Sequence, residues 1–97
     1  MKLSDIDLNL FVVFNAIYTE GNLTRAGEII GITQPAVSNS LSRLRSLFDD
    51  PLFVRTADGM IPTPVAQNII GSVRQGLELF RSSVQESEQF DPKLSDK

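Results

Sequence analysis

Residues 22–45, NLTRAGEIIGITQPAVSNSLSRLR, read as two helices joined at Gly31 by a turn of three residues. In the second helix, four apolar side chains fall on one narrow stripe at helical spacing, which predicts the side that packs against other helices: Val37, Leu41, Leu44 and Phe48. The opposite side carries a proline, small polar groups and one arginine: Pro35, Ser38, Asn39, Ser42, Arg43 and Ser46. This layout is typical of a helix-turn-helix.

The second helix is also free of carboxylates. There is no acidic residue between Ile29 and Phe48, whereas an ordinary solvated helix is rich in Glu and Lys. A face of small polar groups with arginine can approach a polyanion closely, and the second helix of a helix-turn-helix enters the major groove of DNA. The sequence therefore predicts double-stranded DNA as a partner; the alternative is a polar helical hairpin without a ligand.

The amino-acid composition limits which other classes of function the chain can have. With 97 residues and 41% hydrophobic content, the chain can form one small domain. The absence of Cys and His excludes disulfides, thiol nucleophiles, zinc fingers and the commonest general base. A carboxylate cluster of Asp49, Asp50 and Asp58 could be imagined as a metal site in an enzyme, but two lie beside a proline and one belongs to a turn. We expect no enzyme activity, no metal and no cofactor in this chain.

The N-terminus does not resemble a signal peptide, and no apolar run approaches the ~18 residues of a membrane span, so we expect a cytoplasmic protein that does not contact membranes.

A net charge of −3 is unusual for a DNA-binding protein. The charges are unevenly distributed, however, because residues 22–48 hold three arginines against one glutamate while acids gather after Gly76. At ordinary salt, acids that lie more than ~10 Å from the contact surface are largely screened. The arginines still provide only a modest electrostatic attraction to DNA phosphates, which favours binding as a dimer.

A supporting helix is predicted from Leu8 to about Tyr18, with a stripe of apolar side chains that we interpret as core rather than as a ligand pocket: Leu10, Phe11, Phe14, Ile17 and Tyr18. Asp5 or Asp7 can cap its start. Asn22 is suited to cap the next helix, which runs to about Ile30, and Thr33 to cap the one after, with Pro35 in its first turn.

Residues 50–64 change character to β-formers around a turn. Leu52, Phe53 and Val54 precede Asp58-Gly59, and Met60-Ile61 return, which predicts a short β-hairpin, the wing of a winged helix. Arg55 on this wing would lie near the DNA backbone or minor groove. The alternative is a surface arginine paired with Asp58.

The last helix, begun by Thr63-Pro64, carries an apolar seam whose spacing averages 3.5 residues: Ala66, Ile70, Val73, Leu77, Phe80 and Val84. A helix of some 25 residues cannot bury this stripe alone. We expect it to pair with the same helix of a second subunit. The alternatives are that the seam packs on the first helix of its own chain, or that it binds a different protein. Beyond Phe90 the sequence has no periodicity.

From Leu8 to Ala66 the segments DLNLFVVFNAI, TQPAVSNSLSRLR, DPLFVR and PTPVA resemble the N-terminal DNA-binding domain of the LysR family of bacterial transcriptional regulators, in particular the branch of aromatic-degradation and nodulation regulators. The resemblance implies a mainly α fold, with a winged helix-turn-helix over residues 1–63, a linker and dimerisation helix over 64–89, and a hinge over 90–97. The hinge would lead to an effector domain that binds a small-molecule inducer. Because the chain stops at Lys97, we expect an excised DNA-binding domain.

The resemblance also implies roles for single residues. The expected base-reading residues are Gln34, Pro35, Ser38, Asn39 and Arg43, and the expected contacts to the DNA backbone or minor groove are Thr24, Arg25, Thr33, Ser42, Arg55 and Thr63. Asn39 stands where many relatives have arginine, so a different preferred base is expected. Gly27 replaces the usual alanine, which predicts a cost of ~1 kcal/mol in helix stability and a looser helix crossing. The implied partners are a second copy, with a tetramer in the full-length protein, and RNA polymerase.

Overall fold

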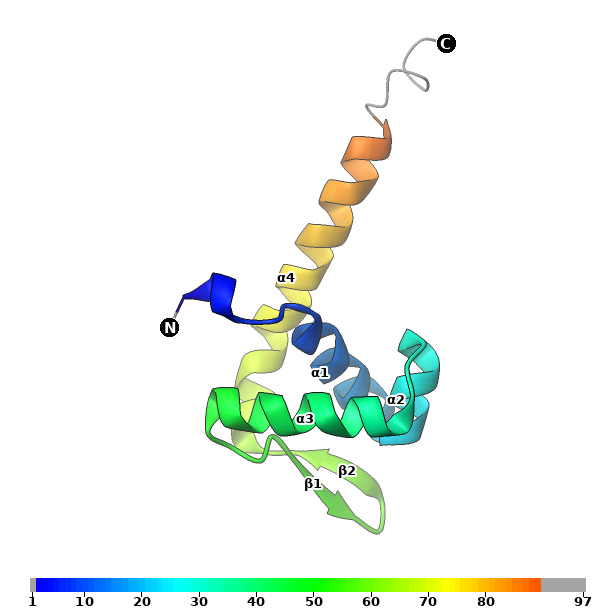
Figure 1. The fold of residues 1–97 in the computed structure, drawn as a ribbon, viewed down its shortest axis with the longest axis vertical. Coiled ribbons are helices and arrows are strands. Elements are labelled where there is room, and N and C mark those ends of the chain that lie inside the picture. The colour runs from blue at the N-terminus through cyan, green and yellow to red at the C-terminus, as the bar shows by residue number, and fades with distance from the viewer. Residues whose placement is uncertain (1, 90–97) are drawn as a thin grey trace.

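The computed structural model describes residues 2–89. A short 3-10 turn is followed by three helices, a β-hairpin and a long helix, in the order η1 (Leu3–Asp5), α1 (Asn9–Glu20), α2 (Leu23–Ile30), α3 (Gln34–Phe48), β1 (Phe53–Thr56), β2 (Gly59–Pro62) and α4 (Pro64–Gln89). Helices α1 to α3 pack together with the hairpin beside them, and α4 projects away (Figure 1). The predicted winged helix-turn-helix followed by a long helix is confirmed. The expected hinge, residues 90–97, lies outside the described residues.

Capping residues set the boundaries of α2 and α3 as the sequence predicts. The Asn22 side chain accepts a hydrogen bond from the backbone N–H of Arg25 at 2.9 Å and starts α2. Thr33 accepts from the N–H of Ala36 at 3.2 Å and starts α3. Gly31 ends α2 in the left-handed conformation, with φ 79°, which makes the sharp turn of the helix-turn-helix possible.

Aromatic side chains of α1 form the centre of the core together with the start of the hairpin. Phe14 and Phe53 are fully buried with ring centroids 5.4 Å apart, and Tyr18 packs on both rings. The predicted inner side of α3 meets them, because Val37, Leu41 and Leu44 are buried, while Phe48 is half-buried against Phe11. Burial of this kind contributes about 1.5–3 kcal/mol for each large side chain. The interpretation of the α1 stripe as core is thus confirmed for Leu10, Phe14 and Ile17, whereas Phe11 and Tyr18 are half-buried at its edge.

The hairpin pairs β1 and β2 antiparallel, with Val54 opposite Ile61 and Thr56 opposite Gly59. Leu52, predicted as a strand residue, lies before β1 and takes the left-handed conformation with φ 64°, so that part of the prediction is wrong. The reason is Asp50, whose carboxylate accepts hydrogen bonds from the Leu52 N–H at 2.8 Å and from the Thr63 hydroxyl at 2.7 Å and so holds a tight turn. Complete burial of the Leu52 side chain offsets the unfavourable backbone.

The hairpin is fastened to the turn between α1 and α2. The Met60 N–H donates to the carbonyl of Gly21 at 2.9 Å. Gly59, with φ 111°, lies so close to that turn that a Cβ atom would stand 2.5 Å from the same carbonyl oxygen. This close approach requires glycine and fixes the hairpin beside the helices.

Gly27 lies in a tight contact rather than a loose one. A Cβ atom there would stand 2.6 Å from the carbonyl oxygen of Ile32 and 3.1 Å from the Val37 side chain. The predicted looser crossing at Gly27 is therefore wrong, because the missing methyl group lets the turn before α3 approach α2 closely.

The apolar seam of α4 divides into two parts. Ala66 and Val73 are buried within the chain, and Ile70 and Leu77 are half-buried, so the first turns pack on the domain. Phe80 and Val84 are each 59% exposed. The described residues contain no helix that is both long and apolar enough to cross a lipid bilayer.

Candidate nucleic-acid interface

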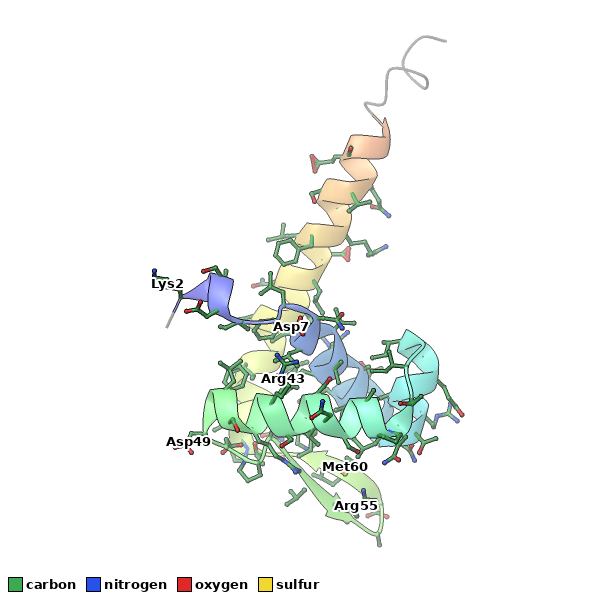
Figure 2. All side chains as sticks on the ribbon, in the orientation of Figure 1. Lys2, Asp7, Arg43, Asp49, Arg55 and Met60 are labelled. Atoms are coloured by element: carbon green, nitrogen blue, oxygen red, sulfur yellow. The ribbon has the colours of Figure 1, made fainter. Side chains whose placement is uncertain are left out.

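The outer face of α3 presents the polar side chains that the helical spacing predicts. Pro35, Asn39, Ser42, Arg43 and Ser46 are exposed, and Ser38 is half-buried. Figure 2 shows α3 crossing the domain, with Arg43 beside Asp7 on one side of it and Arg55 on the hairpin on the other. The opposite side of α3 is packed in the core through Val37, Leu41 and Leu44, and this packing holds the outer face in a fixed position.

Gln34 opens the face at the first position of α3. Its side-chain amide is exposed and donates a hydrogen bond to the Ser38 hydroxyl at 3.3 Å, one turn further along. A side-chain amide can accept through its carbonyl and donate through its NH2 group, and a hydroxyl can do either, so these neighbours offer both kinds of hydrogen bond to a base edge. Asn39 adds a second amide, a group that can pair with the N6 and N7 positions of adenine.

Two arginines near this face hold carboxylates in exposed ion pairs. Arg43 lies 3.4 Å from Asp7, with 53% and 46% of the two side chains exposed. Arg25 lies 3.4 Å from Glu20. Exposed pairs of this length contribute about 0–1 kcal/mol and are readily exchanged for another anion. Both guanidinium groups can therefore turn from their carboxylates to a phosphate.

Arg45 has a structural role that the sequence analysis missed. Its guanidinium donates to the carbonyl of Pro51 at 2.7 Å and to that of Phe53 at 2.9 Å, and so fixes the chain between α3 and β1. A forked donor satisfies two carbonyls at once. The sequence contained no signal for this contact, because backbone carbonyls carry no residue identity.

Arg55 is exposed on β1 of the wing. Among the side chains of residues 2–87, the ion pairs are those of Arg25, Arg43 and Arg81, so the alternative in which Arg55 pairs with Asp58 is not found. Instead, the Thr56 hydroxyl accepts from the Asp58 N–H at 3.1 Å and closes the tip of the hairpin. The Arg55 guanidinium is thus available to an external anion.

The hydroxyl groups that are predicted to contact DNA differ in exposure and in their hydrogen bonds within the chain. Thr24 and Ser42 are exposed at the surface. Thr33 is exposed and caps α3 with its oxygen, which leaves its hydrogen free to donate. The half-buried Thr63 hydroxyl donates to Asp50 and accepts from the Ala66 N–H at 3.2 Å, so both of its capacities are used within the chain.

Asp50, one of the acidic residues near the hairpin, has a local structural role. Asp50 holds the turn before β1, and within the described part of the chain no three His, Cys, Asp or Glu side chains gather where they could hold a metal ion.

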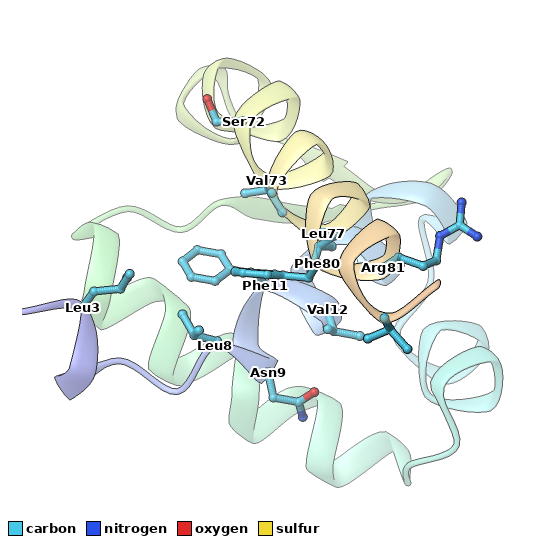
Figure 3. Close-up of a pocket in the computed structure, with 12 residues that line it drawn as sticks. Leu3, Leu8, Asn9, Phe11, Val12, Ser72, Val73, Leu77, Phe80 and Arg81 are labelled. Carbon is cyan, nitrogen blue, oxygen red and sulfur yellow. The ribbon is translucent and has the colours of Figure 1, made fainter. Parts of the chain in front are cut away.

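An open apolar groove of about 720 Å³ runs between the N-terminal segment, α1 and α4. Its apolar lining includes Leu3, Leu8, Phe11, Val12, Leu77, Phe80 and Val84. Figure 3 shows these walls, with Leu3 and Leu8 on the side of the N-terminal segment and Leu77 and Phe80 on α4. The exposed part of the α4 seam therefore continues into a wider apolar surface.

Residues 8–67 match the family model described as bacterial regulatory helix-turn-helix protein, lysR family. The chain belongs to the LysR family. It is 46% identical over 97 residues to the HTH-type transcriptional activator NahR of Pseudomonas putida, covering 100% of this chain and 32% of NahR. It is 42% identical over 95 residues to Nodulation protein D 1 of Bradyrhizobium elkanii, covering 98% of this chain and 30% of that protein. This LysR-family chain thus spans about a third of the length of these relatives, and relatives such as NahR are transcriptional activators, not enzymes.

Solved protein structures share this fold. The probable transcriptional regulator PA0477 from Pseudomonas aeruginosa has a TM-score of 0.82 and 36% identity, covering 93% of this chain and 30% of that one. The complex of BenM_DBD with catB site 1 DNA has a TM-score of 0.79 at 20% identity, covering 87% of this chain and 94% of that one. The winged helix-turn-helix is therefore the fold of this LysR-family chain, and membership of this family of helix-turn-helix regulators supports DNA binding.

Proposed function

We propose that this chain binds double-stranded DNA sequence-specifically as the DNA-binding part of a homodimeric LysR-type transcriptional regulator. In this proposal α3 lies in the major groove and the hairpin lies on the flanking backbone or in the minor groove. The observation that carries it is the outer face of α3, where Asn39, Ser42 and Arg43 stand exposed on a helix without a carboxylate.

The proposed DNA contacts are of two chemical kinds, to base edges and to phosphates. The amides of Gln34 and Asn39 can read base edges, with Pro35, Ser38 and Arg43 beside them. Thr24, Arg25, Thr33, Ser42 and Arg55 surround this strip with donors that suit phosphates, which position a protein without reading sequence. Thr63 remains part of the proposal through rearrangement of its hydrogen bonds, and it is the weakest member because its hydroxyl is already used.

Dimerisation follows from the seam of α4. Ala66, Ile70 and Val73 anchor the helix on its own domain, whereas Phe80 and Val84 are left largely uncovered. The same helix of a second subunit would cover them, and two domains would double the phosphate contacts that a chain of net charge −3 makes.

The remaining parts of the proposal concern the full-length regulator. LysR-family relatives extend well beyond the matched region. We propose that a C-terminal domain binds a small-molecule inducer, that dimers assemble into a tetramer, that RNA polymerase is a contact, and that the protein acts in the cytoplasm. No cofactor is assigned to the chain itself.

A carboxylate placed on α3 tests the proposal. The change Asn39→Asp replaces one amide by a carboxylate on the outer face, and the matched control Gln75→Glu does the same on exposed α4. Affinity would be measured by fluorescence anisotropy on a duplex enriched by the unaltered chain from a randomised pool. We expect Asn39→Asp to abolish detectable binding through repulsion by the DNA and Gln75→Glu to bind within about twofold of the unaltered chain. Equal effects of the two changes would contradict the proposed role of α3.

A further inference from the structure

Arg74 joins α4 to α1 through three contacts of one guanidinium group. Its Nε donates to the Asn15 side-chain oxygen at 2.9 Å, and its Nη2 donates to the Thr19 hydroxyl at 3.0 Å. The same group lies over the Tyr18 ring, 5.2 Å from the centroid. Because residues 15, 18 and 19 share one face of α1, the three contacts converge on a single site.

These contacts differ in kind from the rest of the junction. Around them α4 meets the domain through apolar side chains such as Ala66 and Val73, and apolar contact is not directional. Within the described part of the chain, Arg74 makes both side-chain hydrogen bonds that link α4 to α1. A planar fork held by two acceptors and an aromatic ring restricts rotation as well as distance.

We propose that Arg74 is a positioning residue that sets the angle of α4 to the helix-turn-helix, and thereby the separation of half-sites that the dimer accepts. This inference rests on the proposed homodimeric DNA binding. The part of α4 beyond Arg74 has about 15 residues and is about 22 Å long. A tilt of about 10° at the junction displaces its end by about 4 Å, comparable with one base-pair step of about 3.4 Å.

Arg81 provides a matched control on the same helix. Its guanidinium pairs with Glu78 of α4 itself, at 2.8 Å, and 65% of the side chain is exposed. The changes Arg74→Lys and Arg81→Lys both keep one positive charge, and lysine lacks the planar fork. Only the first change removes the fixed link to α1. A second variant, Asn15→Ala with Thr19→Ala, removes both hydrogen-bond acceptors and keeps Arg74.

The test measures affinity for a set of duplexes that carry the half-sites selected by the unaltered chain, with the spacer changed by one to four base pairs. The unaltered chain and Arg81→Lys are expected to lose at least about 10-fold in affinity for a change of one base pair, since a misplaced half-site resembles a mismatched one. Arg74→Lys and the double variant should lose less than about threefold in affinity over the same change, and their melting temperatures should match that of the unaltered chain.

Two results would overturn the inference. Sharp optima for Arg74→Lys and the double variant, at the same spacing as in the unaltered chain, would leave Arg74 as a structural link only and would leave the proposed function intact. A flat profile for the unaltered chain itself would overturn both the inference and the homodimeric binding on which it rests.

Discussion

Among single residues, the arginines around the helix-turn-helix differ in how freely they can meet DNA. Arg45 donates to backbone carbonyls, Arg43 pairs with the exposed carboxylate of Asp7, and Arg25 pairs with the half-buried carboxylate of Glu20. Arg55 has no such partner among the side chains of residues 2–87. The positive charge available to the proposed DNA interface is therefore smaller than the number of arginines indicates.

Asn39 and Gln34 are expected to affect sequence preference. Each change, Asn39→Ala or Gln34→Ala, should cost about 1–3 kcal/mol per half-site on the preferred duplex and relax the preference at one base pair of each half-site. The measurement is a set of affinities for duplexes with every single-base substitution. Uniform weakening on all of these duplexes would contradict a base-reading role.

Arg55 is expected to affect affinity without affecting sequence preference. Arg55→Ala should weaken binding to all duplexes and reduce the slope of log affinity against log salt by about 1 for each subunit that loses a phosphate contact. Binding would be measured over a range of salt concentrations, with Arg81→Ala as a control that removes a charge from distant α4. An unchanged slope for Arg55→Ala would remove this residue from the interface.

Gly59 is expected to be essential for stability. Gly59→Ala brings a Cβ atom within 2.5 Å of the Gly21 carbonyl oxygen and strains a backbone with φ 111°. It should destabilise the fold by roughly 2–4 kcal/mol, through backbone strain and loss of the Met60 hydrogen bond. The control Gly71→Ala, in open space on α4, should instead stabilise by about 0.5–1 kcal/mol. Thermal unfolding at one protein concentration measures both, and a Gly59→Ala variant that melts at or above the unaltered chain would refute the close approach.

Residue roles were predictable where they depend on neighbours in sequence. Asn22 and Thr33 were predicted as caps because capping is decided within three residues, and both were confirmed. Arg74 meets partners 55 and 59 residues away, so no local pattern indicated it. Arg45 and Asp50 bind backbone groups across a turn whose shape the sequence did not reveal.

At the scale of elements, helix α4 combines two environments on one apolar stripe. The heptad spacing predicted a seam but could not show how much of it the chain itself would cover, because burial depends on where α1 and β2 lie. The structure covers Ala66 and Val73 and leaves Phe80 and Val84 exposed. Similarly, the hairpin was predicted from its β-formers, but Leu52 was misplaced because its tertiary burial outweighs its strand propensity.

The exposed part of α4 is expected to control self-association. Phe80→Asp removes an apolar side chain worth about 1.5–3 kcal/mol from each subunit and should weaken the dimer by about a hundredfold or more. Leu79→Asp is the matched control, since Leu79 is 70% exposed and lies off the seam. Sedimentation equilibrium compares the two, and an intact dimer of Phe80→Asp would place the interface elsewhere.

At the scale of the whole molecule, an acidic chain can present a DNA-binding face because part of its acidic charge lies on the projecting helix α4, away from that face. Helix α3 contains Arg43 and no carboxylate, and the wing carries Arg55, although Asp7 lies beside Arg43. Acids such as Glu78 and Glu86 lie on the projecting helix (Figure 1). Screening over about 10 Å makes this separation effective. A homodimer would then bring two such faces to one duplex, each reading one half-site.

Selection of the purified chain on a pool of randomised duplex DNA tests this account most directly. Sequencing of the retained duplexes should reveal an interrupted palindrome, whose half-sites lie on one face of the double helix, as two symmetry-related α3 helices require. Retention of duplexes without any shared sequence by a folded, dimeric protein would contradict the central claim that α3 reads DNA.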